Sequence, residues 1–254
     1  MKNIKAFLGL SFLFIMAGCA SLNTYVRDFN IVPVSQEVEI GNQMSAEVAK
    51  QMTVLPASSP ESQKVNAIGQ KLVSELPKKE FDYHFYAVKD DSPNAFTIPG
   101  GYIYVHTGTI TFSDNDDMLA GVIAHEIGHA YDRHPAKGIS RQYGISFLET
   151  LALKNNQSQI KELTMKLANQ GILTKYGRDD ENESDAIAYD LLKKSGYSED
   201  GLLLFFKKLV KIQGSGGIPF LSTHPPTSER IARVEQLKAA DAAKITTAST
   251  STKL

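Results

Sequence analysis

The feature that most constrains this chain is the pentapeptide His125-Glu126-Ile127-Gly128-His129. Residues four apart lie on the same face of an α-helix, so the two imidazoles can reach one metal ion. Glu126, beside the first histidine, then points toward a water molecule bound to that ion. The motif therefore predicts a helix over residues 125–129, with one face directed toward further metal ligands.

The residues before the motif predict that helix independently. A cluster of cap-forming and acidic residues at 113–117 stands where the positive end of a helix dipole favours negative charge. Apolar residues then recur at helical spacing from Met118 to Ile123, and we expect the helix to run to about Tyr131. The alternative is a helix whose two histidines are ordinary hydrogen-bonded core residues.

A catalytic zinc takes three protein ligands and a water, so a third ligand must come from elsewhere. The single cysteine excludes a cysteine-rich zinc cluster. One known continuation of the motif needs glycine at 132 and histidine at 135, where this chain has Asp132 and Pro135. His134 lies five residues past His129, off the shared face, and we expect Pro135 to end the helix.

An acidic segment at 178–185 can supply the missing carboxylate. Glu181 and Asp185 are four apart, so Glu181 can bind zinc while Asp185 orients a ligand histidine from behind. Glu183, two residues from Glu181, should point elsewhere. The alternative is that this charge-rich segment is only the solvated start of a helix.

The rest of the pattern predicts a mainly helical α+β domain with a small β-sheet. The net charge is 27 − 28 = −1 and no basic block occurs, which argues against nucleic acid as a partner. We expect helices at about 36–52, 60–76, 139–153, 157–169, 180–194, 199–212 and 228–243, strands at 81–88 and 102–107, and loops at 171, 196 and 214–217.

The N-terminus resembles an export signal. Two lysines precede an almost unbroken apolar stretch at 6–17, which is shorter than the roughly 20 residues that span a bilayer. Met16-Ala17-Gly18-Cys19 resembles the end of a bacterial lipoprotein signal, so we expect lipidation of Cys19, with Ala20 typical of sorting to the outer membrane. The alternative is a plain signal peptide that contains a cysteine. The expected divisions are a signal at 1–18, a tether at 19–35, a zinc metallopeptidase domain at 36–244 and a disordered tail at 245–254.

Several motifs together resemble metallopeptidase family 48, the gluzincins that include heat-shock HtpX, the prenyl-protein endopeptidases and periplasmic, often lipid-anchored quality-control proteases. The resemblance runs from about 36 to 238 in the same order throughout. One departure is Ser184, where the family generally has alanine, and it affects only local helix packing. The matching stretches are His125-Glu126-x-x-His129, Glu181-x-x-x-Asp185, Asn94-Ala95-Phe96 with Pro99-Gly100-Gly101-Tyr102-Ile103-Tyr104-Val105, Tyr176-Gly177-Arg178-Asp179, and Ser222-Thr223-His224-Pro225-Pro226 with Arg230.

These residues predict a zinc endopeptidase with one Zn²⁺ per chain, held by His125, His129 and Glu181, and with Glu126 as the general base. The resemblance implies unfolded or misassembled envelope polypeptides, including outer-membrane proteins, as substrates, and a lipid anchor facing the periplasm. The competing hypothesis is a zinc-bound holdase or assembly factor with little turnover. Retention of Glu126 argues against that hypothesis, because zinc binding alone does not require this carboxylate.

The sequence also predicts where a substrate binds. The segment from Asn94 to Thr107 could expose a strand edge that pairs with an extended substrate through Asn94, Ile103, Tyr104 and Val105, and the alternative is an interior strand.

His224 precedes two prolines and follows a glycine-rich stretch, so it could reach the open zinc position. There it would either displace the catalytic water and silence the enzyme, which we favour for the resting state, or stabilise the oxyanion. The alternative is a surface histidine that caps the neighbouring helix.

Overall fold

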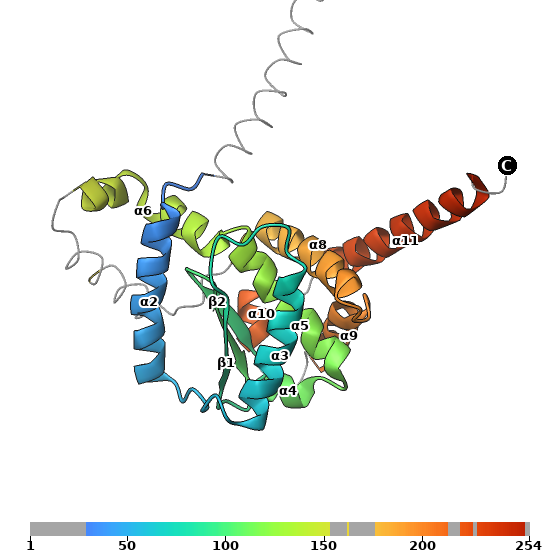
Figure 1. Cartoon of the computed structure of the whole chain (residues 1–254), viewed down its shortest axis with the longest axis horizontal. Helices are drawn as coiled ribbons and strands as arrows, with labels where there is room; N and C mark the ends of the chain where they lie inside the picture. Colours follow the sequence, from blue (N-terminus) through green and yellow to red (C-terminus); the bar gives the residue numbers. More distant parts are fainter. Residues whose placement is uncertain (1–28, 153–161, 163–175, 213–218, 226–227, 252–254) are drawn as a thin grey trace, which may run out of the picture.

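The computed structural model describes residues 29–152, 162, 176–212, 219–225 and 228–251 (Figure 1). Helices surround a small three-stranded sheet, so the expected mainly helical α+β class is confirmed. No helix in these ranges is both long enough and apolar enough to cross a membrane. The elements are α2 (Val34–Gln51), α3 (Pro60–Ser74), β1 (His84–Val88), β2 (Ala95–Ile98), β3 (Tyr102–His106), α4 (Thr107–Phe112), α5 (Asp116–Tyr131), α6 (His134–Ala152), α8 (Arg178–Lys194), α9 (Gly201–Ile212), α10 (Pro219–Thr223) and α11 (Ser228–Ser251).

Helix α5, which carries the pentapeptide, lies at the centre of the fold. Asn115 caps it by accepting a hydrogen bond from the backbone N–H of Met118 at 3.0 Å, and two aspartates follow in the first turn. Every residue from Met118 to Ala130 is buried, because α3, α8, α9 and strand β2 cover the helix on all sides. A fully buried helix gives its polar side chains a fixed, water-poor setting.

Close packing between α5 and α8 depends on Gly128. A Cβ atom at this position would lie 2.8 Å from Cα and 2.9 Å from the carbonyl oxygen of Ser184 on α8. Real side chains do not approach backbone this closely, so only glycine permits this spacing. The close contact brings the start of α8, with its acidic residues, next to the histidines of α5.

The sheet is a layer between α2 on one face and α3 with α5 on the other (Figure 1). Alternation along the strands explains this: Ala95, Ile103 and Val105 pack toward α3 and α5, whereas Phe96 and Tyr104 pack toward Ile40, Met44 and Val48 of α2. Both faces are therefore apolar and both are buried.

Strand order corrects one expectation. The order is β1-β3-β2, with β3 parallel to β1 and antiparallel to β2. Ile103, Tyr104 and Val105 thus belong to the central strand, with neighbours on both sides, and the prediction that they form a free edge is wrong. A short run of sequence does not reveal its neighbours. Strand β2, which the sequence did not separate from β3, is at the edge, but all four of its residues are buried.

The end of the zinc-motif helix agrees with expectation, because α5 ends at Tyr131. Pro135, however, does not end this helix: Arg133 adopts a positive φ of 57°, and Pro135 stands in the first turn of α6. Proline is tolerated there because the first turn of a helix leaves its N–H groups unbonded. Arg133 Nε donates to Glu37 Oε2 of α2 at 2.7 Å, which ties α2 to this corner.

The expected disordered tail from residue 245 is wrong as far as Ser251, because α11 continues to that residue. The segment 228–251 contains neither glycine nor proline, so nothing in it interrupts helical hydrogen bonding. Helices α4 and α10 were not expected at all. The predictions for 1–18, Cys19, 157–169, Gly171 and 214–217 lie outside the described residues, apart from residue 162.

Candidate metal centre

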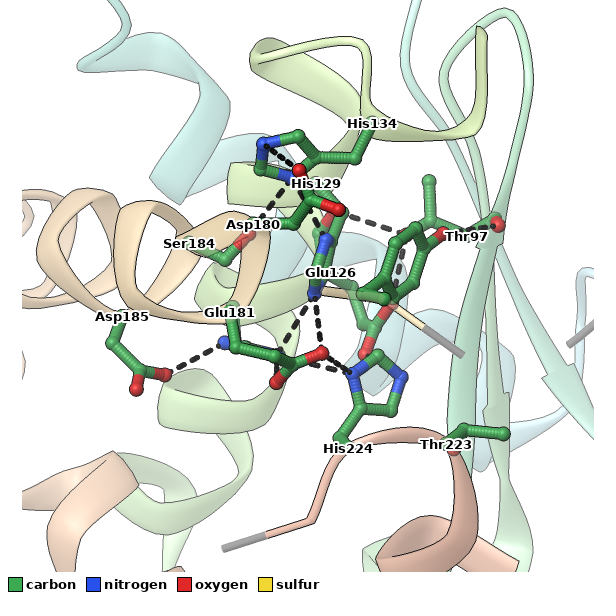
Figure 2. Close-up of polar contacts among 12 residues, drawn as sticks. Thr97, Glu126, His129, His134, Asp180, Glu181, Ser184, Asp185, Thr223 and His224 are labelled. Atoms are coloured by element: carbon green, nitrogen blue, oxygen red, sulfur yellow. Dashed lines mark hydrogen bonds and ion pairs between the residues drawn. The ribbon is translucent and has the colours of Figure 1, made fainter. Parts of the chain in front are cut away.

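His125, His129 and Glu181 come together at the contact between α5 and α8. Figure 2 shows His129 and Glu181 facing each other there. The Nε2 atoms of the two histidines are 3.1 Å apart. Glu181 Oε2 lies 3.4 Å from His125 Nε2, and Oε1 lies 3.5 Å from His129 Nε2. A tetrahedral zinc with bonds of 2.0–2.1 Å would hold its ligand atoms about 3.3–3.4 Å apart. The spacing of these three residues therefore fits one zinc ion.

His224 stands beside the same three residues. Its Nδ1 lies 3.3 Å from His125 Nε2 and 3.0 Å from Glu181 Oε1, again close to the edge of a zinc tetrahedron. The short helix α10 brings it there: the backbone N–H of His224 donates to Phe220 O at 2.8 Å, and the two rings stack. The structure thus brings together four potential ligands, all buried.

Asp185 and Arg230 support the cluster from behind. Asp185 Oδ1 lies 3.0 Å from His125 Nδ1, the ring nitrogen opposite the one that faces Glu181. Arg230 donates to both oxygens of Asp185, at 2.8 and 2.6 Å, and its Nη1 forms an ion pair with Glu181 Oε2 at 2.5 Å. One buried guanidinium therefore orients two carboxylates at once.

The first turn of α8 is fixed by its own contacts. Asp180 accepts from the backbone N–H of Gly177 at 3.0 Å and pairs with Arg141 of α6 at 2.8 Å, which sets the start of the helix. Glu183 points away from the cluster, as the sequence predicts, and pairs with His134 at 3.2 Å.

His134 lies off the ligand face, as the sequence predicts, and does not join the four-residue group. Its Nδ1 contacts Nδ1 of His129 at 2.9 Å, on the side of that ring away from Nε2, and this contact was not expected.

Glu126 lies on the remaining side of the cluster. Its Oε2 accepts from the hydroxyl of Thr97 at 2.8 Å, whereas its Oε1 has no hydrogen-bond partner among the described residues. Oε1 is 3.5 Å from His224 Nε2. A buried, unbonded carboxylate oxygen beside the metal ligands is placed to take a proton from a water molecule in the cluster.

The pKa values of Glu181 and His129 match their ligand roles. Burial opposes the charge on Glu181, but His224, His125 and His129 outweigh it and hold the pKa of this carboxyl well below its usual range. Burial also lowers the pKa of His129 well below normal, so its ring is neutral, as a ligand must be.

For His125 burial also lowers the pKa, but the interactions of its ring with the carboxylates of Asp185 and Glu181 overcome burial and raise the pKa to about 9. Zinc must therefore displace a proton from His125 when it binds near neutral pH.

The cluster is closed to solvent in this conformation. His125, Glu126 and His129 are 0% exposed, and Glu181 and His224 are at most 2% exposed. Tyr176 contributes to the closure, because its ring stacks on His129 with 3.8 Å between centroids and its hydroxyl donates to the carbonyl of Thr97 at 3.3 Å. A substrate must move part of this layer to reach the site.

Sequence reasoning missed four residues around the cluster: Thr97, His134, Tyr176 and Arg230. Tyr176 and Arg230 stand in motifs that carry the family resemblance, so their presence was a signal, but their contacts depend on tertiary structure. Nothing in the local sequence around Thr97 indicates that its hydroxyl meets Glu126, 29 residues away.

A helix-borne histidine pair with an intervening glutamate, completed by a glutamate from a second helix, defines a zinc metallopeptidase of the gluzincin class. The chain belongs to peptidase family M48, whose family model matches residues 59–238. Members of this family are zinc-dependent metallopeptidases, and the buried histidine and glutamate group of this chain can hold one metal ion.

Named relatives agree with the family. Metalloprotease LoiP of Escherichia coli is 27% identical over 259 residues, covering 96% of this chain and 100% of that protein. Beta-barrel assembly-enhancing protease of E. coli is 31% identical over 183 residues, and mitochondrial metalloendopeptidase OMA1 of Schizosaccharomyces pombe is 27% identical over 214. These two matches cover 67% and 83% of this chain, but only 37% and 63% of the respective relatives.

Proposed function

We propose that this chain is a zinc endopeptidase of the bacterial cell envelope that cleaves unfolded or misassembled polypeptides, outer-membrane proteins among them. The observation that carries the catalytic part is Oε1 of Glu126, which is buried beside the four potential ligands and has no hydrogen-bond partner among the residues that the structure describes. A protein that only gripped chains through zinc would not need this carboxylate. The substrate class draws support from a relative named for β-barrel assembly.

The residues have distinct roles in this proposal. His125, His129 and Glu181 would hold the zinc, which when bound acidifies water and polarises the scissile carbonyl. Glu126 accepts the proton of the attacking water on Oε1 and later gives it to the amine that leaves. Asp185 keeps the ring of His125 in the orientation that directs Nε2 toward the cluster.

An extended substrate would add to the outer edge of β2. The N–H of His106 donates to Asn94 O at 3.0 Å, so Asn94 and then every second residue of this segment bond inward to β3. Ala95 and Thr97 consequently direct their N–H and C=O groups outward. The hydroxyl of Tyr176 now binds Thr97 O and would have to leave when the substrate's N–H takes its place.

His224 would silence the resting enzyme. Its Nδ1 stands where a fourth zinc ligand would stand, so it competes with the catalytic water. Withdrawal of α10 would free that position. This arrangement would protect neighbouring envelope proteins from a permanently active protease.

The substrate class can be tested by offering the same substrate protein to the protease in its unfolded and in its folded state. The zinc-loaded chain is incubated with an outer-membrane β-barrel protein, either freshly diluted from urea or already folded in detergent micelles. We expect cleavage of the unfolded form and at least about tenfold slower cleavage of the folded form, because an extended backbone is needed at β2. Equal cleavage of both forms would contradict the proposed substrate class.

The proposed location rests on the N-terminal segment, which resembles a bacterial lipoprotein signal. We propose that Cys19 is the mature N-terminus, carries lipid and anchors the protein to the outer membrane, facing the periplasm. A single acyl chain binds membranes only marginally, so stable anchoring needs several. Mass spectrometry of the mature N-terminus should find a lipid-modified Cys19, and an unmodified start at Ala20 or Ser21 would contradict the anchor.

A further inference from the structure

Thr97 of β2 contacts Glu126 through its side-chain hydroxyl. Its hydroxyl lies 2.8 Å from Oε2 and 2.9 Å from the backbone oxygen of Glu126, and Thr97 is 2% exposed (Figure 2). A threonine hydroxyl has one hydrogen, so it donates to one acceptor at a time. Both acceptors within reach belong to the same glutamate.

We propose that Thr97 is a positioning residue for Glu126, and this inference rests on the proposed role of Glu126 as general base. The bond from Thr97 engages Oε2, whereas Oε1 has no hydrogen-bond partner in the described part of the chain and faces the cluster, 3.5 Å from His224 Nε2. A carboxylate held by one oxygen presents the other in a fixed direction. Without the hydroxyl, the side chain of Glu126 can rotate about its terminal bond, and the fraction of time in the productive orientation falls.

Thr97 also connects the base to the proposed substrate edge. Its side chain points inward to α5, whereas its backbone carbonyl points outward and accepts from Tyr176. If a substrate N–H replaced the Tyr176 hydroxyl as the donor to this carbonyl, the substrate would be bound by the same residue that positions Glu126. Thr97 thereby fixes the distance between the bound chain and the base.

The residue type suits this role. Threonine is β-branched, so its χ1 angle is restricted and its hydroxyl keeps one direction in a strand. Serine offers the same donor with more freedom, and valine has the same shape without the donor. These two replacements therefore separate the hydroxyl from the packing.

The test compares Thr97→Val and Thr97→Ser with Thr109→Val as a matched control. Thr109 is equally buried, and its hydroxyl donates to Asn94 O rather than to the active site. With the zinc-loaded chain and an unfolded protein substrate, we expect Thr97→Val to lower kcat about 10- to 100-fold with KM within about twofold. Thr97→Ser should retain kcat within about threefold, and Thr109→Val should leave it unchanged.

Two readouts do not depend on catalysis. Zinc content should stay at one ion per chain in every variant, because the hydroxyl of Thr97 bonds to Glu126 and not to a proposed zinc ligand. In a double-mutant cycle, Thr97→Val should lower the urea midpoint of unfolding less in a Glu126→Ala background than in the native background.

The outcomes divide clearly. Native kcat in Thr97→Val, failure of serine to rescue, or equal urea shifts in both backgrounds would overturn the proposal. If Thr97→Val does not fold, the proposal is tested by kcat of Thr97→Ser and by the same double-mutant cycle with Thr97→Ala in place of Thr97→Val. If the native chain cleaves nothing, the proposed function fails, whereas the urea cycle still tests the contact between Thr97 and Glu126.

Discussion

Replacing Gly128 with alanine tests how closely helix packing sets the zinc site. The new Cβ would lie 2.8 Å from Cα, 2.9 Å from O and 3.1 Å from Cβ of Ser184. Carbon atoms pack at about 3.5–4.0 Å, so α8 must move away by roughly 1 Å. Glu181 stands one turn earlier on the same helix and moves with it.

The expected loss of zinc affinity follows from how little the ligand distances of a zinc site can vary. Zinc ligands hold their distances to about ±0.2 Å, so a carboxylate displaced by several times that amount binds poorly. We expect the Kd for zinc to rise about 10- to 100-fold, which corresponds to about 1.4–2.7 kcal/mol. Overpacking should also lower the free energy of unfolding of the zinc-free protein by about 1–3 kcal/mol.

The assay is a competition titration against a chromophoric zinc chelator, with thermal unfolding measured in parallel. Gly138→Ala is the matched control, because a Cβ at Gly138 meets nothing within 4 Å, and this variant should keep native zinc affinity. Native zinc affinity in Gly128→Ala would refute the reasoning, whether or not stability falls. It would show that α8 adjusts without moving Glu181.

The remaining predictions concern three side chains. His224→Ala should raise turnover of unfolded substrate, since the ring leaves the fourth ligand position; a fall in kcat of about 10²-fold with KM little changed would instead assign the ring to oxyanion stabilisation. Asp185→Asn should weaken zinc binding about 10- to 100-fold in the same chelator titration, and unchanged affinity would show that His125 needs no support. Burial outweighs Arg133 and raises the pKa of Glu37 from 4.5 to about 7, so the folded protein retains a proton that the unfolded chain has lost. The free energy of unfolding should therefore fall by up to about 3 kcal/mol as pH rises from about 4.5 to 7, and urea titrations of Glu37→Gln should lack this slope.

Helical periodicity explains why much of the site could be predicted. Spacings of four residues put His125 with His129, and Glu181 with Asp185, on common helix faces, and the same rule directed Glu183 elsewhere. Such rules hold because a helix has one geometry whatever surrounds it. The fold class followed from the same periodicity.

Contacts between distant elements escaped prediction because no local rule encodes them. The central place of β3 depends on which strands pair, and the hydroxyl of Thr97 meets Glu126 only because β2 packs on α5. His134 touches His129 because Arg133 reverses the chain with a positive φ, an uncommon conformation for a residue other than glycine. These features come from contacts between elements that are far apart in the sequence.

The most direct test of the central claim is the Glu126→Gln variant, compared with the native chain in zinc content and in cleavage of an unfolded protein. Glutamine keeps the size of the side chain but cannot accept the proton of the attacking water. We predict one zinc per chain in both proteins and loss of cleavage in the variant by at least about 10²-fold. Full cleavage by Glu126→Gln with its zinc retained would contradict the proposed mechanism.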